Sequence, residues 1–211
     1  MSAKPDNEPA PGRERVLDAA ESCLQRFGLA KTTVEDVAQA SGLSRATVYR
    51  QFGSRDALLL AVAARDAERV AGQAERYLRR FEDVGSWIVE GMLFCLREIP
   101  KRPVLSQFLA PQELGAASRM LLTSDRMLAI GSEILRPVFE PTRRQGLLQA
   151  DLELDALMEW VLRILMSLLA VPGPPSRTEE DLRGLLRKML LPAVLVGSEE
   201  AGALLTGVPH A

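Results

Sequence analysis

Histidine is almost absent from this sequence: the only one, His210, is the penultimate of 211 residues. That position offers no buried histidine base, no histidine metal ligand and no cysteine–histidine pair. The chain also contains neither a GxxxxGK(S/T) phosphate loop nor a GxGxxG motif. Catalysis by carboxylates alone stays open, but no pattern points to it. We therefore expect no enzyme, no metal and no cofactor.

Cysteine and aromatic residues are scarce as well. The two cysteines, Cys23 and Cys95, both fall in apolar helical patterns, where a thiol is usually a small core residue. We expect no disulfide and a reducing, cytoplasmic environment. Aromatic residues make up 5% of the chain, whereas leucine and alanine are abundant, and this balance favours helices over sheets. The predicted fold class is all-α.

The sequence has no long uninterrupted hydrophobic run. Its most apolar segment, 154–171, is interrupted by Asp155, Glu159 and Arg163, so we expect no membrane span. Residues 1–9 lack the apolar stretch of a secretory signal and are expected to form a disordered polar arm. The net charge of −2 excludes a protein that coats nucleic acid unselectively, so any DNA site must be a local patch.

The most informative local pattern lies at residues 33–52. Thr33 can cap a helix with Asp36 at the capping-box position, and Gly42 can take the positive φ of a turn. Ser44 is the next N-cap, and the helix that follows has a polar, basic outer face. Residues 41–55 include three arginines and no acid, so the local field has one sign. The pattern predicts a helix-turn-helix that reads DNA; an ordinary helical hairpin is the alternative.

The outer face of the second helix is expected to meet the bases. Arg45, Thr47 and Arg50 are the candidates for reading base edges, and the small Ala46 permits close approach or contacts a thymine methyl. Arg50 is the strongest of them. Arg13 and Lys31 stay open between phosphate contact and plain solvation. The residues expected to contact DNA are Thr33, Ser44, Arg45, Ala46, Thr47, Tyr49, Arg50 and Arg55.

The stretch TTVEDVAQASGLSRATVYRQFGSRDALL resembles the tetracycline-repressor (TetR) family, whose pattern is TT...D(I/V)A..AG(V/L)S.GT(L/V)Y.(H/Y)F.(S/N)K..L. Ala46 stands where the family often has glycine, and Arg55 where it often has lysine; both keep the chemistry. The resemblance implies an N-terminal three-helix helix-turn-helix DNA-binding domain and a C-terminal helical domain for ligand binding and dimerisation, about nine helices in total. The expected divisions are 10–70 for the first domain, 71–197 for the second and 198–211 for a flexible tail.

Apolar residues recur at helical spacing after residue 81 and indicate several further helices. The resemblance implies a small-molecule cavity among them, although each candidate is equally compatible with ordinary core packing. An apolar or amphipathic ligand is weakly preferred. The candidate cavity residues are Trp87, Met92, Cys95, Phe108, Met120, Met127 and Trp160.

Two apolar helices near the end of the chain, after residues 151 and 178, are candidates for an interface between subunits. The resemblance implies that such helices pair across a two-fold axis as a four-helix interface. Periodicity alone leaves a purely internal core as the alternative. The candidate interface residues are Leu157, Val161, Leu165, Leu182, Leu186 and Met189.

Together these patterns predict a one-component transcriptional regulator. We expect a repressor that binds a palindromic double-stranded DNA operator as a homodimer and is released by a small apolar or amphipathic effector. The alternative is a DNA-binding dimer or activator without an inducer, whose C-terminal domain serves only assembly or protein partners.

Overall fold

The protein is all-α, as the sequence predicted. The computed structural model describes residues 12–109, 114–171, 173, 174 and 176–197, so the predicted arm (1–9) and tail (198–211) lie outside the described residues. Within these ranges there are ten α-helices and two 3₁₀ helices, and the only β contact is an isolated bridge between Leu148 and Leu195. The count is close to the nine expected; one of the ten is the short helix Leu105–Phe108.

The helices account for most of the described chain, and none of them combines the length and apolar composition needed to cross a bilayer. In chain order they are α1 (Arg13–Phe27), α2 (Val34–Ser41), α3 (Arg45–Phe52), α4 (Arg55–Leu78), α5 (Val84–Glu98), η1 (Ile99–Lys101), α6 (Leu105–Phe108), α7 (Leu114–Leu122), α8 (Asp125–Arg144), α9 (Leu154–Ala170), α10 (Glu179–Leu190) and η2 (Leu191–Ala193).

Local capping fixes where α2 and α3 begin. The Thr33 hydroxyl accepts from the Asp36 backbone N–H (3.2 Å), and the Asp36 carboxylate accepts from the Thr33 N–H (3.0 Å), which completes a capping box. Hydrogen bonds from the Thr33 side chain and backbone hold the pKa of Asp36 below its ordinary value. Gly42 ends α2 in the left-handed region at φ 65°, and Ser44 caps α3. The predicted turn is therefore present.

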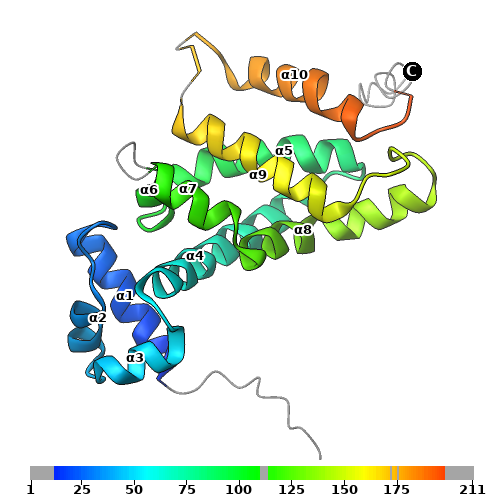
Figure 1. Ribbon diagram of the computed structural model, residues 1–211. Helices are drawn as coiled ribbons and strands as arrows, with labels where there is room; N and C mark the ends of the chain where they lie inside the picture. Colours follow the sequence, from blue (N-terminus) through cyan, green and yellow to red (C-terminus); the bar gives the residue numbers. More distant parts are fainter. Residues whose placement is uncertain (1–11, 110–113, 172, 175, 198–211) are drawn as a thin grey trace, which may run out of the picture.

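Helix α4 connects the two parts of the molecule. Figure 1 shows α1, α2 and α3 gathered at one end of α4 and the helices from α5 onward around the rest of it. Leu59 and Val62 on α4 belong to a core shared with α1 and α2, whereas Ala74 and Leu78 belong to a second core shared with α5 and α9. The helix is continuous from Arg55 to Leu78, so the expected division at 70/71 falls inside it and stays a prediction.

The region after α6 holds two consecutive helices. The chain breaks between α7 and α8 at Thr123 and Ser124. Ser124 is in an extended conformation, and its hydroxyl accepts from the Met127 N–H (3.3 Å), which starts a new helix. Pro137 and Pro141 lie inside α8, which runs on to Arg144.

Candidate DNA-reading surface and apolar cavity

Helix α3 presents its predicted outer face to solvent. Arg45, Ala46, Tyr49 and Arg50 are exposed, while Val48 on the opposite side is 1% exposed and packs in the first core. Positions 45, 46, 49 and 50 follow helical spacing, so they form one continuous strip. The arrangement places two guanidinium groups and a phenol at the surface, where they can meet a negatively charged groove.

The serine and the two threonines expected to contact DNA have hydrogen-bond partners close in sequence. The Thr33 hydroxyl donates to the Asp36 carboxylate (2.6 Å) within the capping box. The Ser44 hydroxyl accepts from the Thr47 N–H (3.1 Å) and lies 3.0 Å from the Thr47 hydroxyl. These side chains order the first turns of α2 and α3, whose N–H groups are the anion-binding ends of the helices. Their contact with DNA stays a prediction.

Arg55 has a structural role that sequence reasoning missed. Its Nε donates to the Thr32 carbonyl oxygen (2.7 Å), and its Nη2 donates to the carbonyls of Leu29 and Ala30. The side chain therefore ties the start of α4 to the turn between α1 and α2. These three backbone oxygens come from residues distant in sequence, so no local pattern points to them. The contact of Arg55 with phosphate stays a prediction.

Arg13 and Arg15 on α1 also bind backbone oxygens at the ends of the neighbouring helices. Arg13 Nη1 donates to the Gln51 carbonyl (3.2 Å) and lies over the Phe52 ring, whereas Arg15 Nε donates to the Ser41 carbonyl (2.8 Å). Cations at helix C-termini complement the helix dipoles. These arginines fix how α1 sits on the helix-turn-helix, while Lys31 is exposed.

A further residue, Glu35, belongs to the reading surface. Its carboxylate forms an ion pair with Arg45 Nη2. The Arg45 side chain is 59% exposed and the Glu35 side chain 50%. The Arg45 guanidinium also lies 6.0 Å from the Tyr49 ring centroid. Glu35 thus places a negative charge beside a base-reading candidate. The only sequence signal for this role was an acidic residue in the first turn of α2.

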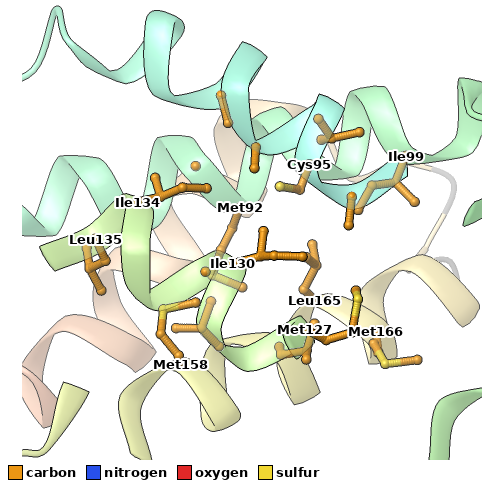
Figure 2. A pocket seen from close by; sticks show the side chains of 18 of the residues that line it. Met92, Cys95, Ile99, Met127, Ile130, Ile134, Leu135, Met158, Leu165 and Met166 are labelled. Carbon is orange, nitrogen blue, oxygen red and sulfur yellow. The ribbon is translucent and has the colours of Figure 1, made fainter. Parts of the chain in front are cut away.

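A second feature is an apolar cavity of about 170 Å³ lined mainly by α4, α5, α7, α8 and α9. Figure 2 shows Met92 and Cys95 of α5 facing Met127, Ile130 and the side chains of α9 across it. Among the described residues, every one that lines the cavity is aliphatic, aromatic, sulfur-containing or glycine. The space therefore excludes ions and favours apolar contents.

Two lining groups carry a hydrogen-bond donor, and neither offers a strong free one. Trp87 Nε1 donates to the Phe81 carbonyl (2.7 Å), so its one donor is occupied. Burial raises the pKa of the Cys95 thiol to about 12, which keeps it neutral. The wall of the cavity has no charged group at neutral pH.

The predicted cavity residues are only partly brought together. Trp87, Met92, Cys95 and Met127 line the cavity. Phe108 is fully buried in the first core, Met120 packs against that core, and Trp160 is 57% exposed on the outer side of α9. These three were grouped with the others by residue type, which does not record the direction of a side chain. Sequence reasoning also missed Met158, Met166 and Gly131; glycines and methionines on the facing helices were the available signal.

The segment from η1 to α6 contacts both the cavity and the DNA-reading end. Ile99 and Leu105 line the cavity. Nearby, the amide of Gln107 donates to the Leu24 carbonyl on α1 (3.0 Å), and Arg102 Nε donates to Asp66 on α4 (2.9 Å). This segment therefore contacts the cavity as well as α1 and α4.

The predicted interface residues mostly face inward. Leu157, Val161, Leu165 and Leu186 are 3–8% exposed and belong to the second core, so in this chain they pack internally. Met189 is 69% exposed, and Leu182 is half-buried. The large apolar side chains exposed on α9 and α10 are Trp160, Leu185 and Met189.

Residues 16–62 match the family model described as "Bacterial regulatory proteins, tetR family". An uncharacterized HTH-type transcriptional regulator of Mycobacterium tuberculosis (strain H37Rv) is 27% identical over 190 residues, which cover 89% of this chain and 88% of that protein. Such relatives are named as regulators, not enzymes, in agreement with the sequence-based expectation.

Two solved structures share the fold. RolR in complex with resorcinol has a TM-score of 0.66 and 18% identity, and covers 95% of each chain. The TetR family repressor AlkX from Dietzia sp., implicated in biodegradation of n-alkanes, has a TM-score of 0.59 and 23% identity, and covers 94% of this chain and 97% of that one. At these identities the likeness establishes the fold alone.

Proposed function

Because the chain belongs to the tetR family of bacterial regulatory proteins, we propose that it represses transcription from a palindromic operator as a homodimer until a small apolar ligand enters the cavity. The chain is a DNA-binding transcriptional regulator. The observation that carries the finer proposal is that α4 joins an exposed reading helix at one end to an apolar cavity at the other. Its place of action is the cytoplasm, where the chromosome lies.

The α3 strip supports direct reading of bases. Arg50 and Arg45 can each make a bidentate contact with a guanine edge, and Ala46 leaves the backbone close to the groove floor. Tyr49 and the N–H groups at the starts of α2 and α3 suit phosphates. One such unit covers a single half-site and binds weakly, so two copies about 34 Å apart are needed for a palindrome.

The exposed apolar side chains of α9 and α10 support the homodimer. Trp160 and Met189 are 57% and 69% exposed, and Leu185 is 40% exposed. Large apolar groups at the surface of neighbouring helices mark an interaction site more often than scattered single residues do. A symmetric pairing of these helices would bury the same patch on both subunits.

The cavity supports release by a ligand. Ala67, Val70, Ala74 and Leu78 of α4 all form its wall, and α4 carries the reading head at its other end. A ligand that fits better when α4 is shifted would stabilise the shifted state by its difference in affinity. The similar structures of RolR, solved in complex with resorcinol, and of the Dietzia AlkX, implicated in biodegradation of n-alkanes, are consistent with a small-molecule effector.

The test is binding of the protein to DNA from the region upstream of its own gene. Fluorescence anisotropy measures this binding with and without hydrocarbons, fatty acids and cationic drugs. We expect salt-dependent binding with two subunits per site, and release by apolar compounds. The second candidate function, a dimer or activator without an inducer, is favoured if every compound leaves the complex intact while the protein still binds the site. A monomer that binds the site fully would contradict the dimer.

A further inference from the structure

The cavity wall has a composition that narrows the chemistry of its contents. The described lining residues offer no strong free hydrogen-bonding group: Trp87 Nε1 is already bonded to Phe81, and the neutral thiol of Cys95 and the methionine sulfurs are only weak partners. A hydroxyl or carboxylate inside this space would lose its water partners without replacing them. The wall therefore disfavours amphiphiles whose polar end must enter the cavity.

The volume sets the size. A dry apolar cavity of about 150 Å³ in another protein accepts benzene, and this one measures about 170 Å³. The space thus holds a compact molecule of about six carbon atoms. Longer hydrocarbon chains fit only if lining side chains move.

One wall of the cavity is adjustable. Met158 of α9 lies flat over Gly131 of α8: a Cβ added to Gly131 would overlap the Met158 methyl and lie 3.6 Å from its sulfur. Both residues line the cavity, and Figure 2 shows Met158 on the same side of it as Ile134 and Leu135, opposite Met127 and Met166. Methionine is flexible and fills irregular gaps, so the glycine provides a notch in which the thioether rests.

We propose that the ligand of this cavity is a small hydrocarbon without hydrogen-bonding groups, and that Met158, lodged in the notch of Gly131, determines the longest chain accepted. The proposal deepens the proposed function, since it takes this cavity as the effector site. Two consequences differ in sign. Removing the Met158 side chain beyond Cβ lengthens the cavity by about three heavy atoms, whereas a methyl on Gly131 pushes the thioether out of its notch and into the cavity.

The experiment measures binding without DNA, by calorimetry or by the rise in melting temperature of the full chain. The probes are benzene, n-pentane, n-hexane, n-octane and n-nonane, with phenol as the polar analogue of benzene. We expect benzene and the C5–C6 alkanes to bind the unaltered protein, and phenol to bind at least about tenfold more weakly than benzene. Equal binding of phenol, or no binding of any hydrocarbon, would overturn the ligand class.

Three variants test the length limit. Met158→Ala should move the preferred alkane up by about three carbons, and Gly131→Ala should weaken n-hexane at least about tenfold relative to n-pentane. In the double variant the added methyl has no thioether to displace, so the length preference should equal that of Met158→Ala. Gly184→Ala, where the added methyl has open space, is the control for the gain in helix propensity.

The outcomes separate the two proposals. If Met158→Ala and Gly131→Ala leave the preferred length unchanged, Met158 is not the selector, whatever the ligands do to DNA. If the lengths shift as expected but no hydrocarbon releases the operator, the proposed function fails while the selector stands. Should Met158→Ala not fold, Gly131→Ala alone decides, because its added methyl meets only the flexible end of Met158.

Discussion

Arg102 donates through Nε to the carboxylate of Asp66 at 2.9 Å, and the Asp66 side chain is only 2% exposed. The same carboxylate also accepts a hydrogen bond from the Leu105 N–H, with 3.4 Å between the nitrogen and Oδ2. This buried pair attaches the segment from η1 to α6 to the middle of α4. Because Ile99 and Leu105 of that segment line the cavity, the pair lies between the cavity and the helix that carries the reading head.

Replacing Asp66 by Ala should destabilise the fold. The change leaves the Arg102 guanidinium and the Leu105 N–H without their partner. Breaking a buried pair costs about 3–5 kcal/mol, and we expect the lower end, about 3 kcal/mol, because Arg102 is 24% exposed and water can reach it. For a chain of this size that corresponds to a fall in melting temperature of about 6–12 °C. The exposed pair of Glu75 and Arg79 supplies the control: Glu75→Ala should change the melting temperature by less than about 2 °C.

Replacing Arg55 by Ala should weaken folding and DNA binding together. Its guanidinium holds the carbonyls of Leu29, Ala30 and Thr32, and charge-assisted hydrogen bonds of this kind contribute about 2 kcal/mol. We expect a lower melting temperature and an equal loss of affinity for operator and unrelated DNA. A loss confined to one base pair, measured by systematic operator variants, would place Arg55 in the groove instead.

Replacing Trp160 by Glu should convert the dimer to a monomer. The side chain is 57% exposed in the single chain, so the substitution leaves the internal core intact and places a charge only in the proposed interface. Sedimentation equilibrium should show at least a tenfold rise in the dimer dissociation constant, together with loss of operator binding. Leu147→Glu, at a 46% exposed apolar residue outside α9 and α10, is the matched control and should stay dimeric. A dimeric Trp160→Glu protein would exclude this surface.

Local features of the structure were predictable from the sequence, and side-chain directions were not. The caps act over three residues: Thr33 pairs with Asp36, and the Ser44 hydroxyl accepts from the Thr47 N–H. Spacing alone therefore located α2 and α3. On α9, by contrast, an apolar stripe through Leu157 and Val161 was a candidate for a subunit interface, with an internal core as the alternative, and in the single chain it packs in the second core. Periodicity shows that a helix face is covered but does not show which chain covers it.

The same distinction applies to the candidate site. The exposed strip of α3 followed from the 100° rotation per residue, because a helix of eight residues has one inner and one outer side. The partners of Arg55 and the ion pair between Glu35 and Arg45 depend on how α1, α2 and α4 pack, which no local pattern encodes. The notch of Gly131 under Met158 likewise arises only when α8 and α9 meet.

The two thiols should resist labelling in the folded protein. Burial raises the pKa of Cys95 from 9.0 to about 12, so at pH 8 its thiolate fraction is lower by a factor of about 1000. Burial is also the first cause of the raised pKa of Cys23. We expect slow reaction with a disulfide reagent at pH 8, and rapid reaction of both thiols after unfolding. Rapid native labelling of Cys95 at pH 8 would show that its side of the cavity is open to water.

Replacing Arg50 by Ala should alter sequence preference more than general affinity for DNA. Arg50 is exposed on the outer strip of α3, and among the described residues its guanidinium has no hydrogen bond or ion pair within the chain. A bidentate contact with a guanine discriminates by about 1–3 kcal/mol, so the variant should lose about that much on the preferred operator and relax its choice at one position of each half-site. Arg79→Ala, at the far end of α4 and 71% exposed, removes the same charge and should leave the preference unchanged. Selection of binding sites from a random pool, sequenced for both variants, measures the effect: a uniform loss across all sequences would assign Arg50 to the phosphates, because a backbone contact carries no base information.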